Sequence, residues 1–133
     1  MFKLFRNHSS EYYLFNCARS GNVKALRKLI ASGVLVDARD RSGRTALGVA
    51  AKYGRTEIVR ALVEAGADIN SKALDGRTPI YFAVHSGSVE VVHLLIDLGA
   101  SLEVQDGAGY TPYSYAAARS QTNILDSLKP ETE

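Results

Sequence analysis

The sequence predicts an all-α solenoid of four helix-turn-helix units joined by turn or hairpin loops. Three observations support this. Several residue types recur about every 33 positions, helix-starting and helix-ending residues recur within each period, and apolar residues recur at helical spacing between them. With 133 residues, of which 46% are hydrophobic, the chain has the length and composition of one globular domain. We therefore treat residues 1–133 as a single domain.

A period of about 33 residues is visible in four separate series of small or polar residues. Two of the series consist mainly of glycine, one of threonine and one mainly of alanine. Independent series that share one period indicate a structural repeat. The members are Gly21, Gly54, Gly87 and Ser120; Gly33, Gly66 and Gly99; Thr45, Thr78 and Thr111; and Cys17, Ala50, Ala83 and Ala116.

A first, short helix is predicted to begin at a threonine in each period. Thr78-Pro79 and Thr111-Pro112 each combine a capping hydroxyl with a proline that suits the first turn, whereas Thr45 keeps the cap alone. The glycine that follows in the first series is expected to end this helix in the left-handed conformation.

A second helix is predicted after that glycine. Ile58, Val59 and Leu62 lie on one apolar face at helical spacing, and the next unit repeats the pattern one period later. The second glycine series ends this helix, and Asp75-Gly76 marks a turn toward the next unit.

Two segments, Asp75–Ile80 (DGRTPI) and Glu64–Asn70 (EAGADIN), resemble the ankyrin repeat, a unit of about 33 residues with a β-turn and two helices. The resemblance implies an ankyrin-repeat solenoid whose end units act as caps with polar outer faces. It specifies the fold and leaves the function open. The four expected units span residues 8–39, 40–73, 74–106 and 107–129.

The family's T-P-L-H histidine is replaced in all four units, by Phe15, Gly48, Tyr81 and Ser114. We expect the hydrogen bonds that this histidine commonly makes in the family to be lost. Glycine inside a helix costs about 1 kcal/mol relative to alanine. The favoured explanation for a glycine at position 48 is close packing between helices, and the alternative is the close approach of a partner.

The end units are expected to differ from the central ones. Ser9 or Ser10 should cap the first helix in place of the missing Thr-Pro pair, and the last helix should be short. Apolar residues at the N-terminus should cover the exposed end of the core. They are Phe2, Leu4 and Phe5.

The sequence contains no pattern typical of a catalytic, metal or cofactor site. His8, His85 and His93 form no HExxH pair, and the glycines in residues 106–110 fit a turn better than a phosphate loop. Cys17, the one cysteine, lies in an apolar run and is predicted to be a core residue. An enzyme is therefore the least favoured class. Without a convincing signal peptide or membrane span, a cytoplasmic location is expected.

The resemblance implies a contact surface on the concave face, made of turn tips and outward residues of each first helix. Carried over position by position, it predicts partner contacts from twelve residues. They are Arg19, Arg39, Arg41, Arg44, Lys52, Tyr53, Lys72, Leu74, Arg77, His85, Tyr110 and Arg119.

The charge on these positions is strongly one-sided. They hold eight of the chain's 16 Lys and Arg residues, and the turn tips add one acidic residue, Asp75. The near-neutral net charge of +2 therefore conceals an asymmetry between a basic concave face and a more acidic back formed by the second helices. Arg55 and Arg60 lie on that back and make the contrast incomplete. The acidic residues on or just after the second helices are Glu57, Glu64, Asp68, Glu90 and Asp97.

These observations favour a protein-interaction module, such as an adaptor, inhibitor or regulator, that binds an acidic protein surface or peptide. Binding of nucleic acid or an anionic lipid by the same face is the alternative, although no nucleic-acid-binding motif is present. The basic residues could also serve only to keep the turn tips hydrated. The resemblance implies a monomer in isolation.

Overall fold

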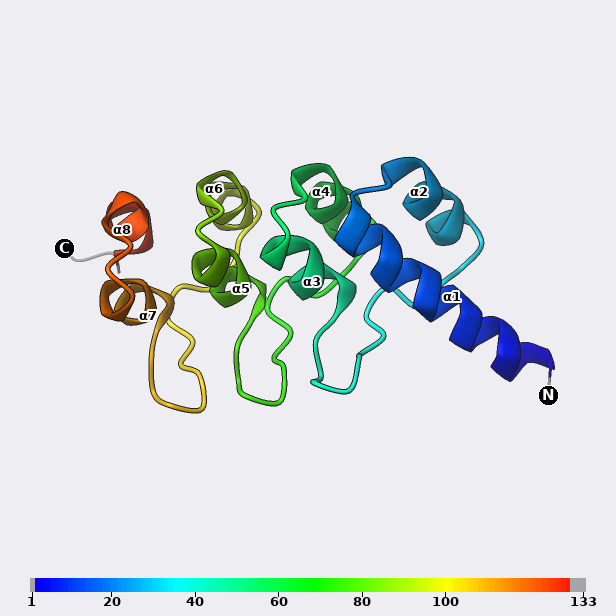
Figure 1. The fold of residues 1–133 in the computed structure, drawn as a ribbon, viewed down its shortest axis with the longest axis horizontal. Coiled ribbons are helices and arrows are strands. Elements are labelled where there is room, and N and C mark those ends of the chain that lie inside the picture. Colours follow the sequence, from blue (N-terminus) through cyan, green and yellow to red (C-terminus); the bar gives the residue numbers. More distant parts are fainter. Residues whose placement is uncertain (1, 130–133) are drawn as a thin grey trace.

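The computed structural model describes the backbone of residues 2–129 and the side chains of residues 10–129. Eight helices form four successive pairs in this part of the chain, and no β-strand occurs there, so the predicted all-α class is confirmed (Figure 1). The helices are α1 (Phe2–Ser20), α2 (Val23–Ala31), α3 (Ala46–Lys52), α4 (Thr56–Glu64), α5 (Pro79–Ser86), α6 (Val89–Asp97), α7 (Pro112–Ala118) and α8 (Thr122–Leu128).

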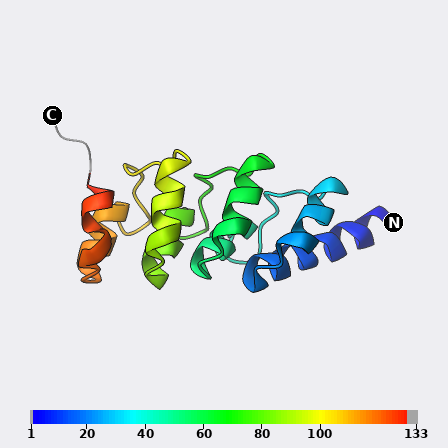
Figure 2. The same cartoon turned by 90° about the horizontal axis from the view of Figure 1, so that it is seen from above.

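The helices are arranged in two parallel rows. The first row contains α1, α3, α5 and α7, each packed on the next, and the second row contains α2, α4, α6 and α8 (Figure 1). Seen from above, the pairs follow one another along the long axis, with α1 and α8 at opposite ends (Figure 2). Residues such as Leu47, Ile58 and Leu95 are fully buried between the rows, and the predicted core residue Cys17 is buried with them.

Three hairpin loops connect the pairs and project from one side of the helix layer (Figure 1). In the first loop, the Gly43 N–H donates to the Asp40 carbonyl and the Asp40 N–H donates to the Arg44 carbonyl, both at 2.9 Å. The same two bonds recur at residues 73–77 and 106–110. The predicted turns are therefore closed hairpins of one geometry.

Neighbouring hairpin loops also contact each other through the backbone. The Gly107 N–H donates to the Asp75 carbonyl at 2.8 Å. A Cβ added at Gly76, whose φ is +81°, would lie 2.8 Å from the Gly107 nitrogen. Glycine is required at position 76 because the next loop passes too close for a side chain and the φ angle is positive.

The threonine caps are confirmed at two of three positions. Thr45 accepts a bond from the Gly48 N–H, and Thr111 forms a reciprocal capping box with Ser114. The prediction is wrong at Thr78, whose buried hydroxyl has no hydrogen-bond partner among the described residues. The Tyr81 N–H donates instead to the Thr78 carbonyl at 3.0 Å, in a tight first turn.

The expected loss of hydrogen bonds at the histidine positions is wrong for two units. Ser114 supplies the returning half of the capping box, and the Tyr81 hydroxyl donates to the carbonyl of Val104 at 2.7 Å. Gly48 is buried, and a Cβ there would lie 3.3 Å from the ring of Phe82. The favoured explanation of Gly48, close packing between α3 and α5, is confirmed.

The two end units differ from the central pairs, though the first differs in an unexpected way. The prediction that Ser9 or Ser10 caps the first helix is wrong, since α1 begins at Phe2 and runs through both serines. Residues 2–20 contain no glycine or proline that would stop the helix earlier. The last helix is short, as predicted, with seven residues. The expected cover of the core end by Phe2, Leu4 and Phe5 falls outside the described side chains.

Candidate partner-binding face

All twelve residues predicted to contact a partner lie on the first-row helices, at their C-terminal ends or on the hairpin loops. Arg19, Lys52 and His85 lie on α1, α3 and α5, and Tyr53 and Arg119 cap the ends of α3 and α7. The other seven residues belong to the three hairpin loops. We call the surface formed by these twelve residues the hairpin face.

The hydrogen bonds of the structure divide the basic residues of the hairpin face into two groups. Arg39 is used within the fold, because its Nη1 donates to the carbonyls of Gly43 at 2.9 Å and Lys72 at 2.6 Å. Arg44 is paired with the Asp40 carboxylate, with 2.9 Å from Nε to Oδ2. Both guanidinium groups therefore hold hairpin loops in place and have fewer N–H donors free for a partner, and the charge of Arg44 is also offset by Asp40.

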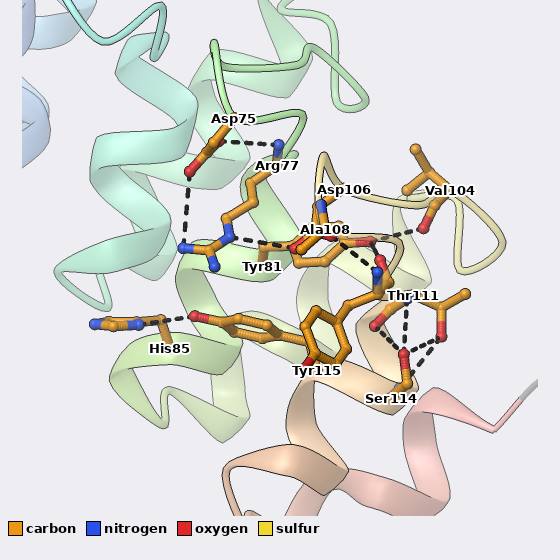
Figure 3. Close-up of polar contacts among 11 residues, drawn as sticks. Asp75, Arg77, Tyr81, His85, Val104, Asp106, Ala108, Thr111, Ser114 and Tyr115 are labelled. Carbon is orange, nitrogen blue, oxygen red and sulfur yellow. Dashed lines mark hydrogen bonds and ion pairs between the residues drawn. The ribbon is translucent and has the colours of Figure 1, made fainter.

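Arg77 and Arg119 are fixed around the ring of Tyr115, which sequence reasoning did not single out. The guanidinium carbons of the two arginines lie 4.7 Å and 5.5 Å from its centroid. Arg77 also pairs with the carboxylates of Asp75 and Asp106 at 3.7 Å and 3.5 Å (Figure 3). Phe82 occupies the equivalent position one period earlier, so an aromatic residue at this position of the repeat was the available signal.

His85 joins the same cluster from α5. Its Nδ1 lies 2.9 Å from the Tyr115 hydroxyl (Figure 3). Burial lowers the pKa of His85 below its usual 6.5, and the positive charges of Arg119, Arg77 and Lys52 lower it further. The imidazole is therefore mainly neutral at pH 7 and adds little charge to the hairpin face.

Tyr81 lies beneath this cluster and fastens the third hairpin loop. Its hydroxyl contacts the carbonyls of Val104 and Tyr110, while its ring meets that of Tyr115 edge to face. Burial, followed by the nearby charge of Asp106, raises the pKa of Tyr81 to about 12. The C-terminal half of the hairpin face is thus an internally bonded network.

The second group of basic residues has no such partners within residues 10–129, whose side chains the structure describes. The side chains of Arg19, Arg41, Lys52 and Lys72 form no ion pair or hydrogen bond with any other side chain or backbone group that the structure describes. Lys52 makes only a cation–π contact, 5.7 Å above the ring of Tyr53. These four cations are therefore concentrated in the N-terminal half and the middle of the hairpin face.

Exposed apolar side chains accompany these cations. Leu74, at the tip of the second hairpin loop, is 81% exposed, and Tyr53 is 46% exposed. Tyr12 on α1, which sequence reasoning missed, is 63% exposed. Tyr12, Phe15 and Arg19 follow one another at helical spacing and so share one face of α1, which is the signal that would have revealed Tyr12.

The described residues offer neither a membrane span nor a metal cluster. No helix among residues 2–129 is long and apolar enough to cross a membrane. In the same part of the chain, no group of three or more His, Cys, Asp and Glu side chains is placed to hold a metal ion.

Helix pairs that recur with one period and are linked by matching hairpin loops define a helical-repeat solenoid. A family model of ankyrin repeats in many copies matches residues 14–59 and 49–96, and the chain belongs to the ankyrin-repeat family. No curated protein matches the sequence. Ankyrin repeats generally mediate protein–protein interactions and are generally non-catalytic.

Proposed function

We propose that this chain is a protein-interaction module that binds an acidic surface or peptide of a partner protein through the hairpin face. The observation that supports this most directly is a set of four cations that have no hydrogen-bond or ion-pair partner among the described residues: Arg19, Arg41, Lys52 and Lys72. Cations on one surface raise the association rate of a negatively charged partner and favour it over a positively charged one.

The partner is expected to engage the N-terminal half of this face more than the C-terminal half. Arg44 and Arg77 already have carboxylate partners, so a ligand carboxylate would compete there with Asp40, Asp75 and Asp106. At Arg19 and Arg41 a carboxylate gains a charge-assisted hydrogen bond without displacing another. As an adaptor, inhibitor or regulator, the module would act by occupying the acidic surface of its partner.

The test is quantitative affinity purification from cell lysate with three forms of the chain. Arg19→Glu/Arg41→Glu/Lys52→Glu reverses three cations of the hairpin face that pair with no described residue. The matched control, Lys24→Glu/Arg27→Glu/Arg60→Glu, makes the same change in charge at exposed positions on the second-row helices α2 and α4. Specific partners should be lost from the first variant and kept by the second.

Equal recovery of the same partners by both variants would remove the hairpin face from the proposal. If the first variant loses binding to nucleic acid or anionic vesicles and keeps its protein partners, the alternative function is favoured. Binding to random oligonucleotides would then weaken steeply with salt. Arg44 and Arg77 are kept unchanged because a glutamate beside Asp40 or Asp106 would also destabilise the fold.

A further inference from the structure

We propose that a cavity between α1 and α3 receives one aliphatic or aromatic side chain of an acidic peptide segment of the partner. The inference rests on the proposed function and specifies the partner's chemistry. The cavity has a volume of about 240 Å³. It is lined by Tyr12, Phe15 and Arg19 from α1, Asp40 and Arg44 from the first hairpin loop, and Val49 and Tyr53 at α3.

The interior of the cavity is suited to an apolar group. Val49 and Phe15 pack against the hydrophobic core and form its apolar lining. Tyr12 and Tyr53 leave large parts of their rings exposed to water beside it. Burying such surface against an apolar side chain is favourable, and tyrosine is among the residues enriched at interface hot spots.

The size of the cavity limits what it can hold. Pockets for drug-sized ligands and cofactors usually measure roughly 300–1,000 Å³. A volume of about 240 Å³ lies below that range and suits a single side chain. The expected occupant is therefore one residue of a polypeptide and not a free cofactor.

The charge around the cavity favours carboxylates on either side of that residue. Arg44 and Asp40 form an ion pair, so their charges largely offset each other. Arg19 also lines the cavity and has no paired carboxylate among the described residues. The recognised segment thus has a leucine or phenylalanine flanked by aspartate or glutamate.

A second hollow continues this surface toward the next unit. It measures about 480 Å³ and is lined by Arg41, Leu74 and Phe82, among others. Arg44 borders both hollows. An extended peptide anchored between α1 and α3 would therefore pass over Arg44 and bring its next residues to Arg41 and Leu74.

The test is a titration of the isotope-labelled full chain, followed by NMR, with two capped peptides, Glu-Asp-Leu-Asp-Glu and Glu-Asp-Ser-Asp-Glu. The leucine peptide should bind about tenfold more tightly, a difference that matches the burial of one apolar side chain. Its shift changes should centre on Tyr12, Val49 and Tyr53. Equal affinity for the two peptides would overturn the cavity proposal.

A pair of adjacent tyrosines provides the matched variants. Tyr12 lines the cavity and Tyr13 does not, although both lie on α1 and both are exposed. Tyr12→Ser should reduce the preference for leucine at least fivefold, whereas Tyr13→Ser should preserve it. Circular dichroism checks that both variants are folded. Equal losses in the two variants would count against the cavity.

Failure of the cavity proposal is distinguishable from failure of the proposed function. If both peptides bind equally and Arg19→Glu/Arg41→Glu abolishes both, the hairpin face binds acidic peptides without an apolar anchor, and the cavity proposal is wrong. If neither peptide binds and a glutamate-rich polypeptide also fails to bind, both proposals are wrong.

Discussion

Replacing Tyr81 by phenylalanine should measurably destabilise the fold, because the Tyr81 hydroxyl links α5 to the third hairpin loop. The Tyr110 carbonyl would keep its bond from the Asp106 N–H at 2.9 Å, whereas the Val104 carbonyl would lose the side-chain donor at 2.7 Å. A lost hydrogen bond with one acceptor left partly unsatisfied costs about 1–2 kcal/mol. With an unfolding entropy of about 0.28 kcal/mol/K for 133 residues, Tm should fall by about 4–7 °C.

Thermal and urea unfolding, followed by circular dichroism, measure this effect. Tyr115→Phe is the matched control, since it removes a hydroxyl whose one hydrogen-bond partner in the described part of the chain is the exposed His85 ring. Its cost should stay below about 1 kcal/mol. A loss below about 0.5 kcal/mol for Tyr81→Phe, or a larger loss for Tyr115→Phe, would refute the role assigned to the Tyr81 hydroxyl.

The pH dependence of the same variant gives an independent check. The pKa of Tyr81 is raised from 10.0 to about 12, so the folded state favours the neutral phenol. The stability that this group contributes is complete below pH 10 and is lost as the pH rises toward about 12. The stability difference between the wild type and Tyr81→Phe should therefore narrow over that interval, and a constant difference would contradict the assigned pKa.

Three further predictions concern single residues. Gly76→Ala should lower the free energy of unfolding in urea by about 1–3 kcal/mol more than Gly109→Ala does. Both glycines have a positive φ, but of the two only Gly76 faces the backbone of the next loop, and equal losses would contradict this packing. Ser120→Gly should raise the free energy of unfolding by about 0.5–1 kcal/mol. Ser120 has a φ of 58°, which strains a residue with a side chain, and the other units have glycine at this position. A decrease in stability would contradict this strain. His85 should titrate below pH 6.5 by NMR. Its contribution to the stability of the fold is therefore complete above pH 6.5 and is lost as the pH falls through the lower pKa of the folded state. Arg119→Gln should raise the pKa of His85, and an unchanged pKa would contradict the assigned cause.

The repeat architecture was predictable because its determinants are local in sequence. Thr45, Gly54 and Gly66 encode a helix start, a helix end and a turn through their own backbone and side-chain chemistry. Spacing alone then repeats the unit. The position of the hairpin face followed from the resemblance combined with this spacing, and all twelve residues lie on the first-row helices, their ends and the loops.

The pairing of side chains between units could not be predicted in the same way. The role of Tyr81 depends on the carbonyls of Val104 and Tyr110, which belong to a loop distant in sequence. Arg77 likewise meets Asp106 in the third hairpin loop and Tyr115 on α7. A count of charges treats Arg19 and Arg77 alike, whereas among the described residues carboxylates pair with Arg77 and none pairs with Arg19. The extension of α1 was missed because the repeat pattern does not reach residues 2–7.

The hairpin face is proposed to bind an acidic polypeptide through the cations that have no partner among the described residues. Fluorescence anisotropy with a labelled glutamate-rich polypeptide at low and moderate salt tests it most directly. The wild type should bind, Arg19→Glu/Arg41→Glu/Lys52→Glu should weaken binding by about tenfold or more, and Lys24→Glu/Arg27→Glu/Arg60→Glu should stay within about twofold. Equal weakening by the two triple variants, or no binding by the wild type at low salt, would contradict the claim.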